Sequence, residues 1–196
     1  LCPYIYLFVN FHLYFSISSF LRCQLSESFS STRKAIDATL TAYKIILEPG
    51  TSNKYMQRDP YFQYIKNNMQ KEIKKDSSKY PLAHKLIKIH DSCSQFGSHA
   101  DISSFIYRLK VENIPGTKKE QVLLSYHQFP KKPEEHRFYF IMVLQSFYLM
   151  FQIFKLFLDA NLKIIDINWE KRIKTLGPEL ETLRKKYYSE IKQEKG

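Results

Sequence analysis

Few residues in this chain have the chemistry of a proton-transfer or phosphate-binding site, and His99 is the most distinctive of them. An apolar helical pattern ends at Gly97, and Ser98 with Asp101 forms an S-x-x-D capping box that starts the next helix. His99 is therefore expected beside the free backbone N–H groups of a helix N-terminus, where its imidazole stays neutral. The alternative is a capping-region histidine that only hydrogen-bonds to the backbone.

Two residues of opposite charge, Arg33 and Asp37, stand one helical turn apart at the edge of an apolar stripe. An exposed ion pair at this spacing stabilises a helix by only about 0.3 kcal/mol. Both side chains could instead reach into a polar pocket. In that case Arg33 and Asp37 are candidate site residues.

The sequence lacks the common catalytic and cofactor motifs. It contains no GxGxxG, GxxxxGK[ST], HExxH or GxSxG pattern, and its five glycines leave no Gly-rich loop for a phosphate. The three cysteines are far apart and form no CxxC pair, which is typical of reduced thiols in a cytosolic protein. Cys93 lies on an apolar stripe and is expected in the core. We therefore expect no cofactor and no metal site.

The chain is strongly basic, with a formal charge of +11 over 196 residues. Residues 54–88 contain nine Lys or Arg but three Asp or Glu. Such a segment attracts phosphate backbones or anionic membranes, whereas the alternative is a solvated, lysine-rich face. The candidate binding residues are Lys66, Lys71, Lys74 and Lys75.

Apolar periodicity predicts an all-α bundle of five to six helices in a single domain, residues 1–196. The expected helices are residues 20–47, 59–75, 81–97, 134–161 and 166–193, the last of them broken at Gly177 and Pro178. Asp59 followed by Pro60 is a typical helix start. Weak alternation on both sides of a Pro-Gly turn predicts a small β-hairpin near residues 107–126, and residues 178–196 form a charged C-terminal helix.

Two stretches are apolar enough to raise the question of a membrane. Residues 1–21 carry no charge, and residues 138–157 carry only Lys155. Asn10 and His12 near the middle of the first stretch favour a buried first helix, and no basic residue precedes it as in a signal peptide. A cytoplasmic protein is therefore expected, with a membrane segment at residues 1–21 as the alternative.

The order of these features resembles the HEPN-like all-helical bundles of prokaryotic proteins, including those linked to abortive infection. A long helix carries Arg33 and Asp37 where the family has arginine and then an acidic residue four positions on. A later helix ends with Ser94 and His99, where the family has a Ser-x-x-x-His pattern, so the gap here is one residue longer. The resemblance covers roughly residues 20–159. It implies that His99 and Arg33 are the catalytic candidates and that Asp37 and Ser94 are candidate binding residues.

Catalytic members of the HEPN superfamily carry arginine, four to six residues, and then histidine, and this motif is missing before His99. The resemblance therefore implies a non-catalytic interaction module in a defence or toxin–antitoxin context. Its expected partners are RNA or another nucleic acid, a second copy of the chain, and an antitoxin-like protein. The alternatives are a divergent metal-independent ribonuclease that uses His99 with Arg33 and Ser94, and a membrane-anchored helical protein.

Overall fold

Six helices of eleven residues or more make up most of the protein in a computed structural model, which describes residues 1–97, 109–124, 133–161 and 167–193. The predicted all-α bundle with a small hairpin is confirmed. The long helices are α1 (Cys2–Leu21), α2 (Leu25–Leu47), α5 (Ile65–Lys75), α6 (Ala83–Gly97), α8 (Pro133–Asn161) and α9 (Ile167–Gln193). The short elements are a 3-10 turn η1 (Pro49–Thr51), α3 (Ser52–Met56), α4 (Pro60–Gln63), β1 (Leu109–Asn113) and β2 (Glu120–Leu124).

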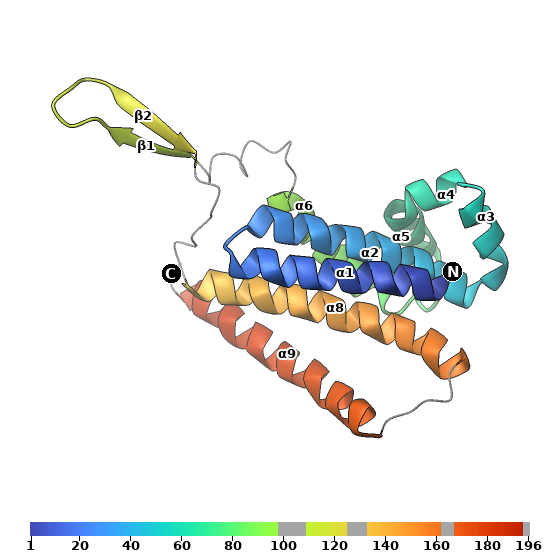
Figure 1. Ribbon diagram of the computed structural model, residues 1–196. Helices are drawn as coiled ribbons and strands as arrows, with labels where there is room; N and C mark the ends of the chain where they lie inside the picture. The colour runs from blue at the N-terminus through green and yellow to red at the C-terminus, as the bar shows by residue number, and fades with distance from the viewer. Residues whose placement is uncertain (98–108, 125–132, 162–166, 194–196) are drawn as a thin grey trace.

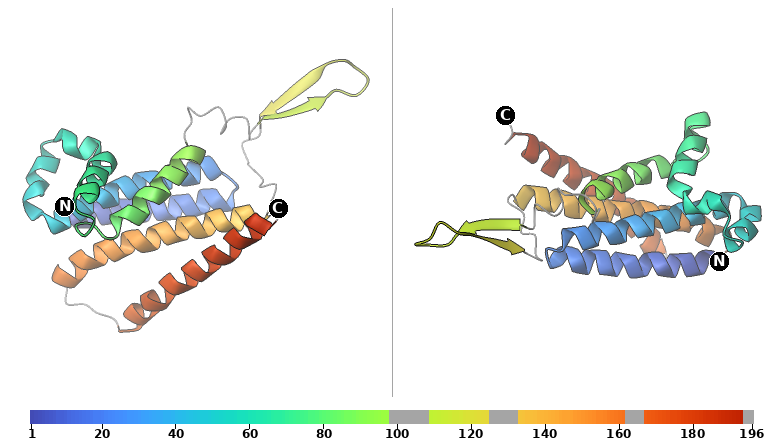
Figure 2. Two further views of the ribbon diagram at one scale, coloured as in Figure 1. Left: turned by 180° about the vertical axis from the view of Figure 1, so that it is seen from behind. Right: turned by 90° about the horizontal axis from the view of Figure 1, so that it is seen from above.

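Helix α2 is the centre of the bundle. It packs against α1, α6 and α8, and α5 touches it near its C-terminal end (Figure 1). Helix α9 packs along α8, while α3, α4 and α5 gather at the end of the bundle where the N-terminus lies (Figure 2). The apolar stripe predicted for α2 forms the middle of the core, with Phe29, Ile36, Leu40 and Tyr43 almost fully buried.

The prediction of one helix over residues 20–47 is wrong, because the chain turns back between α1 and α2. Cys23 adopts a left-handed backbone conformation with φ of 57°, and its N–H donates to the Phe20 carbonyl oxygen at 2.9 Å. The Gln24 N–H donates to the Ser19 carbonyl oxygen, also at 2.9 Å. These bonds end α1 as a left-handed cap does, and α2 then runs antiparallel to α1.

A short row of polar side chains joins α1 to α2 inside the bundle. The His12 ring nitrogen Nδ1 lies 2.7 Å from the Ser31 hydroxyl, and the Ser16 hydroxyl lies 2.9 Å from those of Ser28 and Thr32. All five side chains are buried. Buried hydroxyls need such partners, so this row fixes the face of α1 that meets α2.

The opposite face of α1 is apolar and exposed, so the predicted buried first helix is buried on one side only. Six large side chains on this face, 46–77 % exposed, recur at helical spacing. They are Tyr4, Leu7, Phe8, Phe11, Tyr14 and Phe15. Helices α1 and α8 are both long and apolar enough to cross a membrane. The core helix of a soluble protein can have the same length and composition.

The predicted helix starts and ends agree with the structure in part. The Asp59 carboxylate accepts a hydrogen bond from the Tyr61 N–H at 2.8 Å, which confirms the N-cap. The helix expected over residues 59–75 is divided at Tyr64 into α4 and α5. Helix α6 is described as far as Gly97, so its predicted end there lies at the edge of the described residues and stays a prediction.

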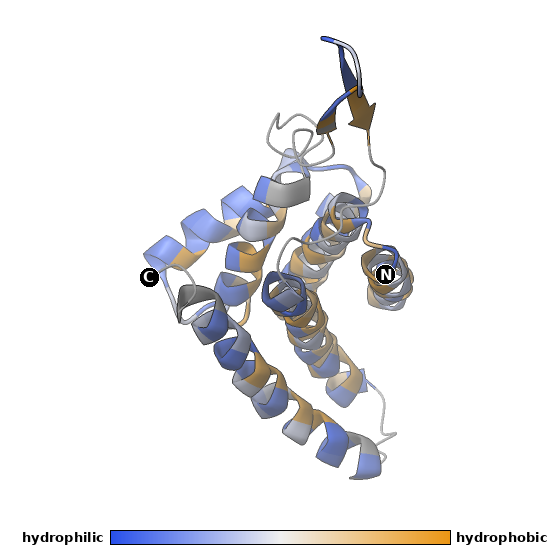
Figure 3. Cartoon of the chain, turned by 90° about the vertical axis from the view of Figure 1, so that its left-hand side faces the viewer, coloured by the Kyte–Doolittle hydropathy of each residue, from blue (hydrophilic) through white to orange (hydrophobic). Residues whose placement is uncertain are grey.

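The predicted break at Gly177 and Pro178 is wrong, because α9 continues through both residues. A Cβ atom on Gly177 would lie 2.5 Å from the Tyr148 hydroxyl oxygen, so glycine lets α9 approach α8 closely here. Ile173 and Leu180 are buried on the same side. Figure 3 shows the apolar side of α9 turned toward the other helices and its hydrophilic side turned outward. Packing on α8 therefore outweighs the local tendency of Gly-Pro to end a helix.

The predicted hairpin is confirmed as β1 and β2, paired antiparallel from Leu109 with Leu124 to Asn113 with Glu120. Gly116 occupies the turn with φ of +78°. The hairpin projects from one end of the bundle, and every side chain of β2 is exposed (Figure 1). It is an appendage to the core, as the sequence indicates.

Candidate functional site

Helices α2 and α6 pack antiparallel, and the predicted site residues Arg33 and Asp37 of α2 lie at this helix contact. Tyr43 stacks edge-on against Tyr80, which precedes α6, with ring centroids 5.5 Å apart. Further along, Asp37 faces His90, and one turn beyond that Arg33 lies near Cys93. As the residue number falls on α2 it rises on α6, so Arg33, Asp37, His90 and Ser94 form one cluster, here called the α2–α6 polar cluster.

His90 is the centre of the α2–α6 polar cluster. Its residue is only 6 % exposed, and its Nε2 atom lies 3.5 Å from the Asp37 Oδ1 atom. On the other side of the ring, Nδ1 lies 3.4 Å from the Ser94 hydroxyl and 3.7 Å from Asp91 Oδ1. A carboxylate beside one ring nitrogen orients an imidazole for proton transfer, so the pair has the arrangement of an acid–base group.

Ser94 supports the ring without being free to act as a nucleophile. Its hydroxyl donates to the His90 carbonyl oxygen at 2.8 Å, as serines in helices often do. Ser94 positions the imidazole of His90 from the same helix.

Arg33 brings a positive charge to this cluster. Its Nε atom is buried and has no hydrogen-bond partner among the residues that the structure describes. Asp37 faces His90 rather than Arg33, and the described residues contain no ion pair between Arg33 and Asp37, so the polar-pocket alternative fits the geometry. A buried N–H without an acceptor carries a desolvation cost that a bound anion would relieve.

Cys93 lies near Arg33 and is fully buried. Burial raises the pKa of its thiol to about 12, although the positive charge of Arg33 opposes that rise. The thiolate is the nucleophilic form of cysteine, and it is scarcely populated at neutral pH at such a pKa. The predicted core role of Cys93 is confirmed.

The other predicted site residues lie outside the cluster or at its edge. His99 falls outside the described residues. The Lys66 Nζ atom lies 2.7 Å from Asp91 Oδ1, so it joins α5 to α6 beside His90. Lys71, Lys74 and Lys75 are exposed on α5. His90 was not predicted as a site residue from the sequence. Its position one turn before Ser94, on the edge of the α6 apolar stripe, could have indicated it.

A second polar cluster, here called the Lys44 network, lies where α2 meets α5. Lys44 is 7 % exposed, and its ammonium lies 2.8 Å from Glu48 and 3.1 Å from Glu72. Lys79 bridges the same two carboxylates at 2.9 and 2.8 Å, and Tyr80 lies 3.1 Å from Lys44 Nζ. Burial alone would raise the pKa of Glu72, but hydrogen bonds from Lys79, Tyr61 and Lys44 outweigh it and lower that pKa to about 2. The network is fully compensated, which is typical of a structural site.

The fold and these clusters define an all-α bundle with a small hairpin and an Arg–Asp–His group between two helices. Compared with protein-family models, curated proteins and solved structures, the chain shows no significant similarity to any of them. Among the described residues, no group of three or more His, Cys, Asp or Glu side chains could hold a metal ion.

Proposed function

We propose that this chain is a non-catalytic, HEPN-like interaction module of a prokaryotic defence or toxin–antitoxin system, cytoplasmic and in contact with RNA. The observation that carries the RNA contact is a set of exposed lysines on α5 and α6, here called the α5–α6 lysines. They are Lys71, Lys74, Lys75, Lys85 and Lys88.

The carboxylates near the α5–α6 lysines are already engaged elsewhere. Glu72 belongs to the Lys44 network, Asp76 accepts hydrogen bonds from the backbone and side chain of Ser78, and Asp91 pairs with Lys66. None of the α5–α6 lysines makes an ion pair with a described residue. Their charge is therefore available to phosphates, and an RNA that binds there releases counterions.

A salt titration of RNA binding tests this contact. For single-stranded RNA the slope of log K against log salt is about −0.7 per phosphate contact, so five contacts correspond to about −3.5. Changing Lys71, Lys74 and Lys75 to Gln should make the slope about 2 units shallower. The matched control changes three exposed α9 cations, Lys171, Lys174 and Lys186, to Gln. Equal losses in both triple variants, or no binding of random RNA at low salt, would remove RNA from the proposal.

Self-association is the second part of the proposed module, and it rests on the exposed face of α1. Tyr4, Leu7, Phe11 and Tyr14 occupy successive a and d positions of a heptad, with Phe8 and Phe15 beside them. With about 200 Å² for each large side chain, their exposed fractions amount to about 700 Å² per copy, close to the roughly 800 Å² per partner of a stable dimer. No basic residue lies within α1 to attract an anionic membrane surface, so a second copy is the favoured occupant.

Sedimentation velocity over a range of concentrations tests the dimer. The wild-type chain should sediment as a dimer at micromolar concentration, and Phe11→Glu should shift it to monomer. Exposed Leu183 on α9, changed to Glu, is the control and should leave the dimer intact. A wild-type chain that is monomeric and floats with neutral vesicles would instead favour the membrane alternative. If the dimer covers the exposed face of α1, an antitoxin-like protein would have to bind another surface of the chain.

A ribonuclease is the second candidate function, favoured by the Asp37–His90 pair and by Arg33 on the same helix contact, whose Nε has no hydrogen-bond partner among the described residues. An imidazole could accept the proton of a ribose 2′-hydroxyl, while a nearby guanidinium stabilises charge on the phosphorane. RNA cleavage should then fall by at least 100-fold in His90→Ala and in Arg33→Gln, with circular dichroism and melting temperature preserved. His99→Ala tests the role of the other predicted histidine. Cleavage unchanged in all three variants would sink this candidate.

A further inference from the structure

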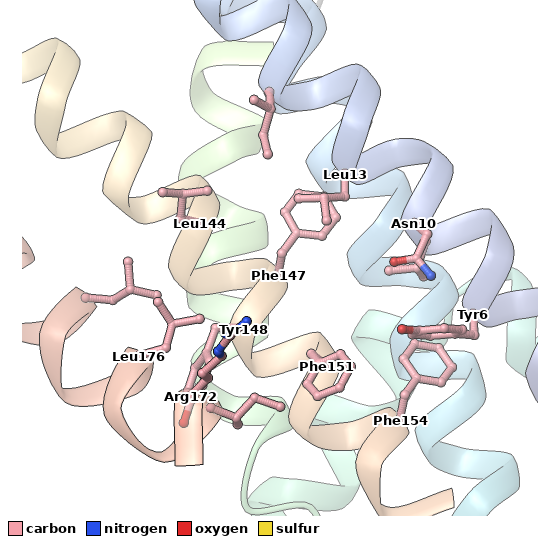
Figure 4. A pocket seen from close by; sticks show the side chains of 14 residues that line it. Tyr6, Asn10, Leu13, Leu144, Phe147, Tyr148, Phe151, Phe154, Arg172 and Leu176 are labelled. Carbon is pink, nitrogen blue, oxygen red and sulfur yellow. The ribbon is translucent and has the colours of Figure 1, made fainter. Parts of the chain in front are cut away.

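An apolar cavity lies between α1, α8 and α9, away from the α2–α6 polar cluster and from the α5–α6 lysines. Its volume is about 340 Å³, within the range of small-molecule sites of about 300–1,000 Å³. Helix α8 forms its floor through Phe147 and Phe151, α1 forms one wall, and α9 forms the other (Figure 4). The α1 and α9 walls share no extensive contact with one another, so the cavity opens between them.

Four polar side chains line this cavity, those of Tyr6, Asn10, Tyr148 and Arg172, and none has a hydrogen-bond or ion-pair partner among the described residues. Arg172 comes from α9, and Tyr6 and Asn10 come from α1. In Figure 4 the guanidinium of Arg172 points into the cavity from one side, and the Tyr6 hydroxyl and the Asn10 amide face it from the other. The remaining lining is apolar, so a ligand would be held by burial of an apolar body and placed by these few groups.

The charge at the α9 side of the cavity is positive. Glu170, two residues before Arg172, is engaged by Lys155 at 3.5 Å, and Lys155 also pairs with Asp159. Arg172 lines the cavity from its exposed rim, and Lys171 and Lys174 are exposed beside it on α9. The polar end of a ligand here is therefore expected to be an anion, and a planar guanidinium suits a carboxylate because it can donate two parallel hydrogen bonds.

We propose that this cavity binds a single-chain carboxylic acid, with its carboxylate at Arg172 and its alkyl chain between Phe147, Phe151 and α1. The cavity volume and its apolar lining suit a medium-length alkyl chain, for which dodecanoate is the probe. This proposal does not depend on RNA binding or on self-association, because none of its residues belongs to those surfaces.

Titration calorimetry with dodecanoate below its micelle concentration tests the proposal. The wild-type chain, stripped of bound lipid, should bind one dodecanoate per protomer, and 1-dodecanol should bind at least tenfold more weakly. Arg172→Gln should weaken dodecanoate by at least tenfold and leave dodecanol unchanged, since only the charged contact is lost. Lys186→Gln removes one positive charge farther along α9 and should bind dodecanoate within twofold of wild type.

The exposed face of α1 could also adsorb a fatty acid. A variant that fills the cavity distinguishes binding inside the cavity from such adsorption. Leu144→Trp should abolish the one-to-one binding while circular dichroism keeps its wild-type form. If that variant does not fold, Val9→Phe serves the same purpose from the α1 wall. Unchanged dodecanoate binding in a folded cavity-filled variant, or in Arg172→Gln, would overturn the proposal. Binding to phosphatidylglycerol vesicles without binding of free dodecanoate would overturn it as well, because the source would then be a bilayer headgroup.

Discussion

Changing Glu72 to Gln tests whether the Lys44 network stabilises the fold. The carboxylate accepts hydrogen bonds from Lys44, Lys79 and Tyr61, and it lies 3.1 Å from the Tyr80 hydroxyl. Glutamine keeps the size of the side chain and one acceptor oxygen but removes the charge. The two lysines then retain Glu48 as their shared partner.

The expected loss follows from the pKa of Glu72, which falls from 4.5 to about 2 in the folded state. A difference of this size corresponds to at most about 3 kcal/mol at neutral pH, and the Glu48 that remains should reduce the loss to about 2 kcal/mol. Because the folded-state pKa is lowered, this stabilisation is fully present above pH 4.5. It is lost as the pH falls from 4.5 through 2, where both states become protonated.

Urea unfolding followed by circular dichroism at pH 7, 4.5 and 3 measures this difference. At pH 7, Glu72→Gln should be about 2 kcal/mol less stable than wild type, and the gap should narrow by pH 3. Glu120→Gln, on the exposed strand β2, is the matched control and should cost less than about 0.5 kcal/mol. A Glu72→Gln variant as stable as wild type at pH 7, or a gap that does not depend on pH, would refute the reasoning.

Three further predictions concern Gly177, His12 and Cys93. Gly177→Ala should destabilise the chain by about 1 kcal/mol because its methyl group would meet Tyr148, yet in a Tyr148→Ala background it should stabilise by about 1 kcal/mol through helix propensity; chemical denaturation measures both. Burial, with a smaller effect of a nearby lysine, lowers the pKa of His12, so stability present above pH 6.5 should fall as the pH drops below it, and His12→Asn should flatten that dependence in urea titrations. Cys93 should react with a thiol reagent only in urea, at the rate of unfolding, because its side chain is fully buried; labelling of native protein would contradict this.

Helical periodicity predicted most of the bundle, since the stripes on α2 and α6 each have one apolar side that must be covered, while α8 is apolar around most of its circumference. Local signals predicted the Asp59 cap and the hairpin turn as well. The turn at Cys23 was missed because apolar residues continue at helical spacing on both sides of it. The continuity of α9 was missed because it depends on Tyr148, a contact between residues far apart in sequence.

The candidate site was predicted only in part for the same reason. Arg33 and Asp37 were identified from their spacing within one helix and Ser94 from the resemblance, and the antiparallel packing of α2 on α6 brings them together. The partner of Asp37 is His90, and no local pattern links the two. Lys44 likewise resembles a solvent-facing lysine in the sequence, whereas the segment from Glu72 to Tyr80 encloses it.

The position of the β1–β2 hairpin outside the bundle has a consequence for how this protein can change. Its strands contribute no residue to the hydrophobic core. Residues 114–119 could therefore be lengthened, shortened or replaced by an unrelated peptide at almost no cost to the unfolding free energy of the helices. Mutations at the tip of the hairpin can therefore give the protein a new binding specificity while the sequence of the helical bundle is conserved for stability.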